Sequence, residues 1–205
     1  MAYSNDLCKL VINNMDIIEE APSVVGEVEE LLFEAINKRI REKIEPMEGW
    51  EGIYDLCTEK NEDEEMTIFR APRWPIDDEG EYLAWYELGI IDGDEIEDAN
   101  WLTYAVGVKE SRLVIGFDSD KKYHGNTPGQ LKKFFRNYFE HNPQLAQAGV
   151  IFEDGYLGIP FHLDPEKMSE EYPNFNECLK PVDDALDALL KAHPYFDTLV
   201  DELKK

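Results

Sequence analysis

The clearest periodic pattern in the chain covers residues 23–44, where apolar residues recur at three- and four-residue steps. This spacing predicts a helix with one apolar stripe that faces the core. Glutamates gather in the N-terminal half of the segment and basic residues toward its end, an order that favours a helix because it opposes the helix dipole. A shorter helix is predicted at residues 7–18, packed on the same core.

The middle of the chain, from Trp50 to Asp118, changes to a β pattern rich in aromatic and β-branched residues. The short polar segments within it favour an antiparallel meander, since a parallel pair of strands needs a crossover of about a dozen residues or more. Lys109–Ser111 is short enough for a hairpin between the last two strands. Five strands are predicted, at residues 52–58, 66–70, 82–91, 101–108 and 112–117.

A further helix is predicted to begin at Thr127, a good N-cap residue that is followed by Pro128 at the first helical position. Beyond it, residues 150–153 and 156–161 predict a hairpin across an Asp-Gly turn. These signals place a helix and two more strands after the meander.

The C-terminal region carries two apolar stripes with helical spacing, at residues 178–190 and 196–203, separated near Pro194. The order of elements predicts an α+β fold. Its sheet is mainly antiparallel, with five to seven strands, and packs against N-terminal, central and C-terminal helices. Residues 1–205 are expected to form a single globular domain, because no repeat or low-complexity linker divides them.

Charge distinguishes this chain from an ordinary globular domain. It has 45 acidic and 20 basic side chains, a formal net charge of −25, although 12% aromatic residues argue against intrinsic disorder. Such a charge keeps a protein soluble and repels nucleic acid and anionic membranes. Plain solubility is one interpretation, and a surface that meets a basic partner is the other.

The acidic residues concentrate between Glu45 and Asp98, where 19 acidic side chains face 3 basic ones. Three clusters lie in predicted loops beside the sheet, and Trp74 and Trp85 are candidate anchors of an interface. Solvated loops are the simpler interpretation of these clusters. The functional one is a surface, here called the acidic-loop surface, that consists of Glu62, Asp63, Glu64, Glu65, Trp74, Asp77, Asp78, Glu79, Trp85, Asp92, Asp94, Glu95, Glu97 and Asp98.

The leading hypothesis is therefore an acidic interaction protein that binds a basic protein surface, for instance that of a nucleic-acid-binding protein. It would act as an inhibitor, an antitoxin-like neutraliser or a nucleic-acid mimic, steered onto its partner by charge. Duplex nucleic acid and membranes are not expected as partners. This hypothesis assigns no catalytic residue, metal or cofactor.

The alternative is a metal-dependent hydrolase or nuclease-like enzyme. Glu87 lies on a predicted strand, and Asp118, Asp120 and Lys121 lie at the end of a neighbouring strand. Clustered carboxylates hold divalent ions, and a lysine often assists. The net charge opposes a polyanionic substrate, and no glycine-rich phosphate loop, nucleophile elbow or zinc-protease motif occurs in the sequence.

Three weaker signals remain open. His162, Asp164 and Glu166 alternate after a strand and can bind a metal, but polar residues before a helix more often form a cap and a turn. Basic residues before Thr127 offer an anion site at a helix N-terminus, or else a solvated basic face. A pocket between the sheet and the helices would instead bind a small molecule or peptide.

The cysteines, at positions 8, 57 and 178, are odd in number and widely spaced, which does not predict a disulfide framework. The first six residues lack the basic and apolar regions of a signal peptide. No apolar run approaches the roughly 20 residues that span a bilayer. A cytoplasmic location is therefore expected.

Overall fold

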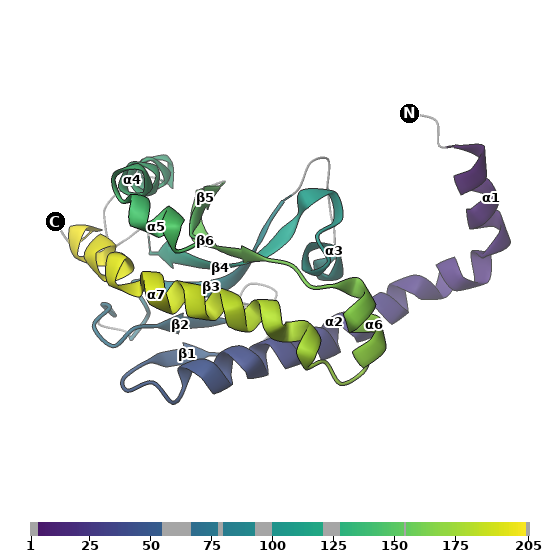
Figure 1. Cartoon of the computed structure of the whole chain (residues 1–205), viewed down its shortest axis with the longest axis horizontal. Helices are drawn as coiled ribbons and strands as arrows, with labels where there is room; N and C mark the ends of the chain where they lie inside the picture. The colour runs from purple at the N-terminus through teal and green to yellow at the C-terminus, as the bar shows by residue number, and fades with distance from the viewer. Residues whose placement is uncertain are drawn as a thin grey trace.

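A six-stranded antiparallel sheet forms the centre of the computed structural model, which describes residues 4–54, 67–77, 80–92, 100–120, 128–153 and 155–203 (Figure 1). The strand order is β1-β2-β3-β4-β6-β5. The strands are β1 (Glu51–Ile53), β2 (Ile68–Arg70), β3 (Ala84–Ile91), β4 (Arg112–Ser119), β5 (Ile151–Glu153) and β6 (Tyr156–Phe161). The predicted α+β class and the antiparallel sheet are confirmed.

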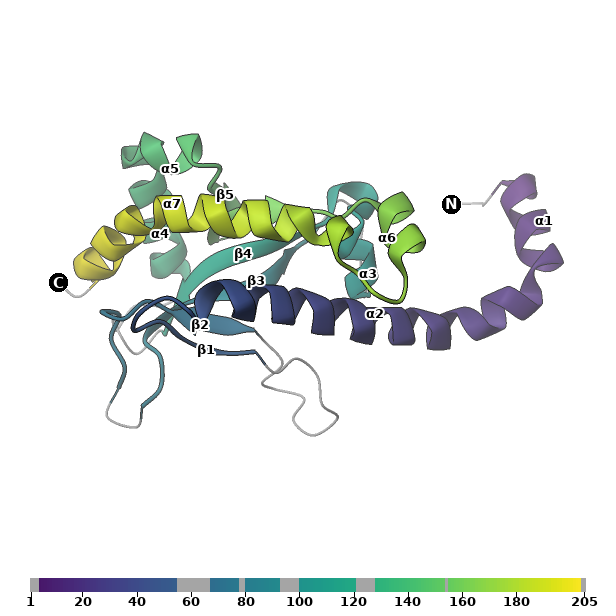
Figure 2. The same ribbon diagram turned by 60° about the horizontal axis from the view of Figure 1, so that its bottom comes forward.

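Two long helices, α2 (Met15–Ile44) and α7 (Lys180–Leu203), form a layer on one face of the sheet and run side by side (Figures 1 and 2). The helices are α1 (Asn5–Asn13), α2 (Met15–Ile44), α3 (Trp101–Ala105), α4 (Pro128–His141), α5 (Pro143–Gln147), α6 (Pro165–Glu171) and α7 (Lys180–Leu203), with 3-10 turns η1 (Val108–Glu110) and η3 (Glu177–Leu179). Ion pairs from Arg39 to Asp183 (3.3 Å) and from Lys43 to Asp187 (2.6 Å) join α2 to α7. None of the helices in the described residues is both long and apolar enough to cross a bilayer.

The core lies between this helical layer and the sheet. Ile36 and Ile40 of α2 are fully buried, which agrees with the predicted apolar stripe. Tyr86 of β3 and Phe117 of β4 pack against Phe196 of α7, with ring centroids 5.3 and 5.4 Å away. Each such side chain stabilises the fold by roughly 1.5–3 kcal/mol on burial, so this aromatic cluster holds α7 on the two central strands.

The strand predicted at residues 101–108 is wrong, because this segment forms α3. The side chain of Asn100 caps the helix by accepting the backbone N–H of Thr103 at 3.0 Å. Trp101 packs edge-on against Phe33 of α2, with ring centroids 4.8 Å apart. Aromatic composition favours a strand, but the cap and this tertiary contact override the propensity.

The hairpin predicted at Lys109–Ser111 is also wrong, since η1 occupies this connection. Gly107 ends α3 with φ at +72°. Lys109 and Glu110 then take φ values of +51° and +68°, in the left-handed region. The chain therefore enters β4 from a helical turn, and β3 and β4 pair without a tight hairpin.

The predicted hairpin near the C-terminal third is present as β5 and β6, which pair antiparallel. The two C-terminal stripes belong to one helix, α7, with Pro194 inside it. Proline removes one helical hydrogen bond, but Leu189 and Phe196 are both fully buried on either side of it. Their packing carries the helix through the proline.

The short N-terminal helix is present, but its predicted packing on the core is wrong. Residues 5–26, here called the arm, comprise α1 and the beginning of α2 and project from the body (Figures 1 and 2). The side chain of Asn14, between the two helices, donates to the carbonyl of Leu10 at 2.7 Å. Contact with the body is made at Glu27, whose carboxylate accepts a hydrogen bond from the Tyr172 hydroxyl at 3.0 Å.

Candidate functional site

Part of the predicted acidic-loop surface lies in the residues that the structure describes. Asp77 closes a turn, in which its carboxylate accepts the backbone N–H of Glu81 at 2.9 Å. Asp92 is exposed and accepts a 2.7 Å hydrogen bond from the Tyr104 hydroxyl. Trp74 and Trp85 are also described. Outside the described residues lie Glu62, Asp63, Glu64, Glu65, Asp78, Glu79, Asp94, Glu95, Glu97 and Asp98.

The role of interface anchor predicted for Trp74 is wrong, because this side chain belongs to the core. Only 3% of Trp74 is exposed. Its ring lies 4.7 Å from that of Tyr86 and 5.3 Å from that of Phe117, measured between centroids. Its indole N–H donates to Oδ1 of Asp197 at 2.8 Å, so its polar atom is also satisfied within the chain.

Trp74 belongs to a network of polar side chains within this aromatic core. The Tyr86 hydroxyl lies 2.9 Å from Nδ1 of His193, and Nε2 of His193 lies 3.4 Å from Oδ1 of Asp197. Burial lowers the pKa of His193, and the charge of Asp197 partly opposes that change. Because Tyr86 is fully buried, the contact with His193 satisfies its hydroxyl group within the core.

Trp85 lies on the opposite face of the sheet from the long helices, together with Glu87. Side chains alternate along a strand, and Tyr86 between them is in the core. Strand register pairs Trp85 with Asp118 and Glu87 with Gly116 of β4. The structure thus brings Glu87 and Asp118 together on one face of adjacent strands, as the alternative hypothesis required.

Glycines give this face its close packing. Gly116 pairs directly with Gly158 of β6. A Cβ at Gly158 would lie 2.6 Å from a methyl group of Val114, and one at Gly116 would lie 3.2 Å from the Tyr156 ring. The Tyr156 ring therefore lies over Gly116, which brings its hydroxyl within hydrogen-bonding reach of Glu87.

Glu87 is a strongly perturbed carboxyl group on this face. Only 3% of the residue is exposed, and the indole N–H of Trp85 donates to Oε2 at 2.7 Å. Burial, and to a lesser degree the nearby Asp118 charge, raise the pKa of Glu87 to about 7, while the hydrogen bonds from Trp85 and Tyr156 oppose this change. A carboxyl group with this pKa can both give and take a proton near neutral pH.

Tyr156 responds to the same environment. Burial raises the pKa of its hydroxyl to about 12, and the charges of Glu87 and Asp118 act in the same direction. The hydroxyl therefore keeps its proton at neutral pH and serves Glu87 as a hydrogen-bond donor. A base at position 87, a tyrosine donor and a second carboxylate are thus assembled from three neighbouring strands.

The carboxylates at the end of β4 are part of the same region. The backbone N–H of Ser119 donates to Oδ1 of Asp118 at 2.7 Å, and the N–H of Asp120 donates to the Leu83 carbonyl at 3.1 Å. Lys121 lies outside the described residues. Within the described part of the chain, no group of three or more His, Cys, Asp or Glu side chains is arranged to hold a metal ion.

The alternation of His162, Asp164 and Glu166 is explained by a helix cap. Oδ1 of Asp164 accepts the backbone N–H groups of Glu166 at 2.9 Å and Lys167 at 3.4 Å. Asp164 is therefore the N-cap of α6, and the cap interpretation is confirmed.

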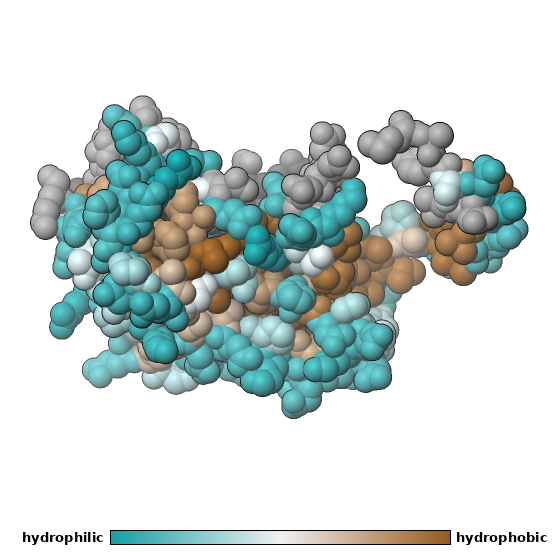
Figure 3. Space-filling model, turned by 45° about the horizontal axis from the view of Figure 1, so that its top comes forward, coloured by the Kyte–Doolittle hydropathy of each residue, from teal (hydrophilic) through white to brown (hydrophobic). Residues whose placement is uncertain are grey.

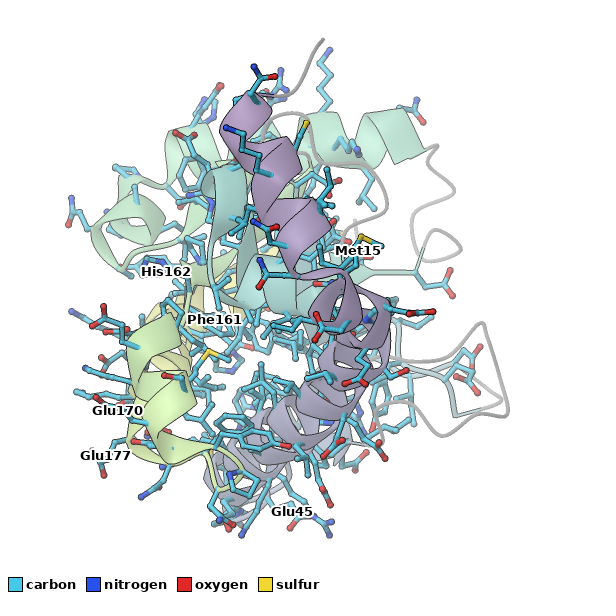
Figure 4. All side chains as sticks on the ribbon, turned by 90° about the vertical axis from the view of Figure 1, so that its right-hand side faces the viewer. Met15, Glu45, Phe161, His162, Glu170 and Glu177 are labelled. Carbon is cyan, nitrogen blue, oxygen red and sulfur yellow. The ribbon has the colours of Figure 1, made fainter. Side chains whose placement is uncertain are left out.

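A groove of about 560 Å³ lies between α2 and the segment at residues 173–176. Arg39 on its wall is already engaged, since it donates to the Asn176 carbonyl at 2.9 Å and pairs with Asp183. Figure 4 views this end of the molecule, with Glu170 and Glu177 pointing away from α2. The groove differs in place from the predicted pocket between sheet aromatics and helices.

Sequence reasoning missed Tyr156 and the glycine pair. Gly158 stands inside a predicted strand, and an isolated strand glycine is a known signal of close backbone approach. That signal marks a crowded position but does not say which strand lies alongside it.

Comparisons of this chain with protein-family models, with curated proteins and with solved structures found no match.

Proposed function

We propose that this chain is an acidic interaction protein that binds a basic protein partner. The observation that carries the proposal is the size of its charge excess, 45 acidic against 20 basic side chains. Even if every basic group paired with one carboxylate, the remaining carboxylates would have no cation of this chain to neutralise them. Such an excess favours association with a positively charged macromolecule and speeds it.

The ion pairs of the described residues support this view. Several join neighbours one helical turn apart, such as Arg41 with Glu45 and Lys180 with Asp184. Others connect α2 with α7. The basic side chains in these pairs are used within the fold, while the segment from Glu45 to Asp98 has only 3 basic residues for its 19 acidic ones.

The test is affinity capture from extract of the native cell with two variants of equal charge. In the first, Glu62, Asp63, Glu64 and Glu65 are changed to their amides. In the matched control, four acidic residues of α6, η3 and α7 are changed instead, namely Glu166, Glu170, Glu177 and Glu202.

We expect a basic partner to be captured at low salt and released at high salt, because charge attraction is screened by ions. The first variant should lose most of the partner, and the control should retain it. Equal capture by both variants and by the native chain would overturn the proposal.

The location of Glu87 and Asp118 on one face of adjacent strands favours a second candidate, a metal-dependent hydrolase or nuclease-like enzyme. In this candidate Glu87 and Asp118 would contribute carboxylate ligands to the ion. The test measures thermal stability with and without Mn²⁺, and cleavage of single-stranded and duplex nucleic acid. A Mn²⁺-induced shift that Glu87→Gln abolishes would support this candidate, and the absence of both shift and cleavage would dismiss it.

A further inference from the structure

Exposed apolar side chains are concentrated on the arm. Among the residues described, eleven large hydrophobic side chains are exposed, and seven of them belong to the arm. Ile12 is 70% exposed and Ile17 63%. The seven are Leu10, Val11, Ile12, Met15, Ile17, Ile18 and Val24. A concentration of this kind marks a surface that meets another molecule.

The apolar stripe of α2 continues unbroken from the core into the arm. Its members recur at three- and four-residue steps and are Ile18, Ala21, Val25, Val28, Leu32 and Ile36. Leu32 and Ile36 are fully buried by the body, whereas Ile18 is 40% exposed. In Figure 3, hydrophobic residues extend from the body onto the projecting helix. The same helix face is thus covered at one end and bare at the other.

Coverage of this face would stabilise the arm considerably. Each large apolar side chain contributes roughly 1.5–3 kcal/mol when it is fully buried. A helix as short as α1, with nine residues, is marginal without tertiary packing. A second helix laid along the stripe would supply that packing by the usual interdigitation of side-chain ridges and grooves.

The charges around the stripe select the kind of partner. Residues 5–34 carry eight acidic side chains and a single basic one, Lys9. A second copy of the arm would place carboxylates beside carboxylates, which destabilises a helix pair. Helices that bind membrane surfaces are rich in lysine and arginine, the reverse of this composition. A helix flanked by basic residues fits both the stripe and its charged borders.

We propose that the arm binds, by helix–helix packing, an amphipathic helix of another protein that carries lysine or arginine on both sides of its apolar stripe. Ile17, Ile18 and Ile12 of this chain supply the apolar contacts, and Asp16, Glu19 and Glu20 pair with the basic flanks. The inference rests on the proposed function for the sign of the partner's charge. It assigns the apolar contact to the arm rather than to the acidic-loop surface.

The experiment uses the full chain and two synthetic peptides of three heptads each. One has leucine at the two core positions and lysine at the flanking ones, and the other has glutamate in place of lysine. Affinities are measured by titration calorimetry at physiological salt. The arm variant is Ile17→Ser with Ile18→Ser, and the matched control is Ile53→Ser with Ile76→Ser, which are exposed apolar side chains of the body.

The lysine peptide should bind the native chain and the control alike and should lose at least tenfold in affinity for the arm variant. The glutamate peptide should not bind. Because both pairs of side chains are exposed, circular dichroism and thermal melting should show that each variant remains folded. A second arm variant, Ile12→Ser, should show the same loss of affinity for the lysine peptide. A failure of the lysine peptide to bind, or equal affinity for the two variants, would overturn the inference.

Two further outcomes would replace the proposed partner. A dimer of the native chain that the arm variant dissociates would make a second copy the occupant. Arm-dependent binding to vesicles with anionic lipids would make it a membrane. The variant with amides at residues 62–65 separates the two proposals. If it still captures the partner and the native chain binds the lysine peptide, only the proposed function is refuted. If it loses the partner and the native chain does not bind the lysine peptide, only this inference is refuted.

Discussion

The indole N–H of Trp85 donates a 2.7 Å hydrogen bond to Oε2 of Glu87, the next residue on the same face of β3. This contact stabilises the carboxylate, but burial of the group outweighs it and raises the pKa of Glu87 to about 7 from 4.5. The folded protein therefore binds a proton at position 87 over a pH range in which the unfolded chain has released it.

Replacement of Glu87 by glutamine should change how stability depends on pH. The folded-state pKa is the higher one, so the native contribution of Glu87 is fully present below pH 4.5 and is lost as pH rises to about 7. The loss amounts to on the order of 3 kcal/mol. Glu87→Gln does not undergo this loss. Its unfolding free energy minus that of the native chain, measured by urea denaturation, should therefore rise by this amount from pH 4.5 to pH 8.

The exposed Glu48 provides a control for this measurement. Glu48→Gln should follow the native pH dependence across the same range. Parallel curves for Glu87→Gln and the native chain would show that Glu87 titrates normally.

His193 should contribute a pH dependence of opposite sign. Burial lowers its pKa below 6.5, so the unfolded chain binds a proton that the folded chain excludes. Stability from this group is fully present above pH 6.5 and is lost as the pH falls below that value through the lowered folded-state pKa. Thermal melting between pH 5 and 7.5 should show a smaller acid-induced loss in His193→Asn than in the native chain. His141→Asn, at an exposed position, is the control and should keep the native loss.

Substitutions at Trp74 test its place in the core. Trp74→Ala should cost about 3–5 kcal/mol of unfolding free energy, the usual loss for a large buried aromatic side chain. Trp74→Phe keeps a ring but removes the hydrogen bond to Asp197, and should cost about 1 kcal/mol from that bond, together with the loss of the larger indole. A cost for Trp74→Ala below about 1 kcal/mol in urea denaturation would place this side chain at the surface.

Two glycines should respond to alanine in opposite ways. At Gly158 a Cβ would lie 2.8 Å from the Cα of Gly116, so the backbones of β4 and β6 must separate. Overpacking of this kind costs roughly 1–3 kcal/mol or more. At Gly26 no atom lies within 4 Å of the new Cβ, and alanine favours a helix by about 0.5–1 kcal/mol. Denaturation of the two variants under identical conditions checks both signs, and destabilisation by both would contradict the expectation for the helix.

Local patterns predicted the elements that local physics dominates. The stripe of α2 was readable because helical spacing persists through its buried half, from Leu32 to Ile44. The β5–β6 hairpin was readable because an Asp-Gly pair separates its strands, and Gly155 has φ at +99° as such a turn requires.

The errors arose where tertiary contacts decide the structure. Trp101 has a β-favouring side chain, but it packs on Phe33 of a helix far away in sequence. The length of α2 was underestimated, since the predicted helix began at residue 23 whereas α2 begins at Met15 and passes through Pro22. Sequence composition does not reveal which of these competing preferences prevails.

The candidate site was predictable only in part. Glu87 and Asp118 lie on β3 and β4, which pair antiparallel and are consecutive strands, although α3 and η1 lie between them in the sequence. Tyr156 reaches them because β6 inserts beside β4, which is a long-range pairing. Its position above Gly116 depends on strand register, which no local pattern in the two segments specifies.

The continuity of α2 has a mechanical consequence. The helix that begins at Met15 in the arm is the one that buries Ile36 and Ile40 beneath the sheet. A force applied to the arm is therefore transmitted to the core, because one continuous helix connects the arm with the body. The weakest link along this rod is at Pro22, which cannot donate a hydrogen bond to the carbonyl of Ile18, so tension should open the helix there before it disturbs the sheet.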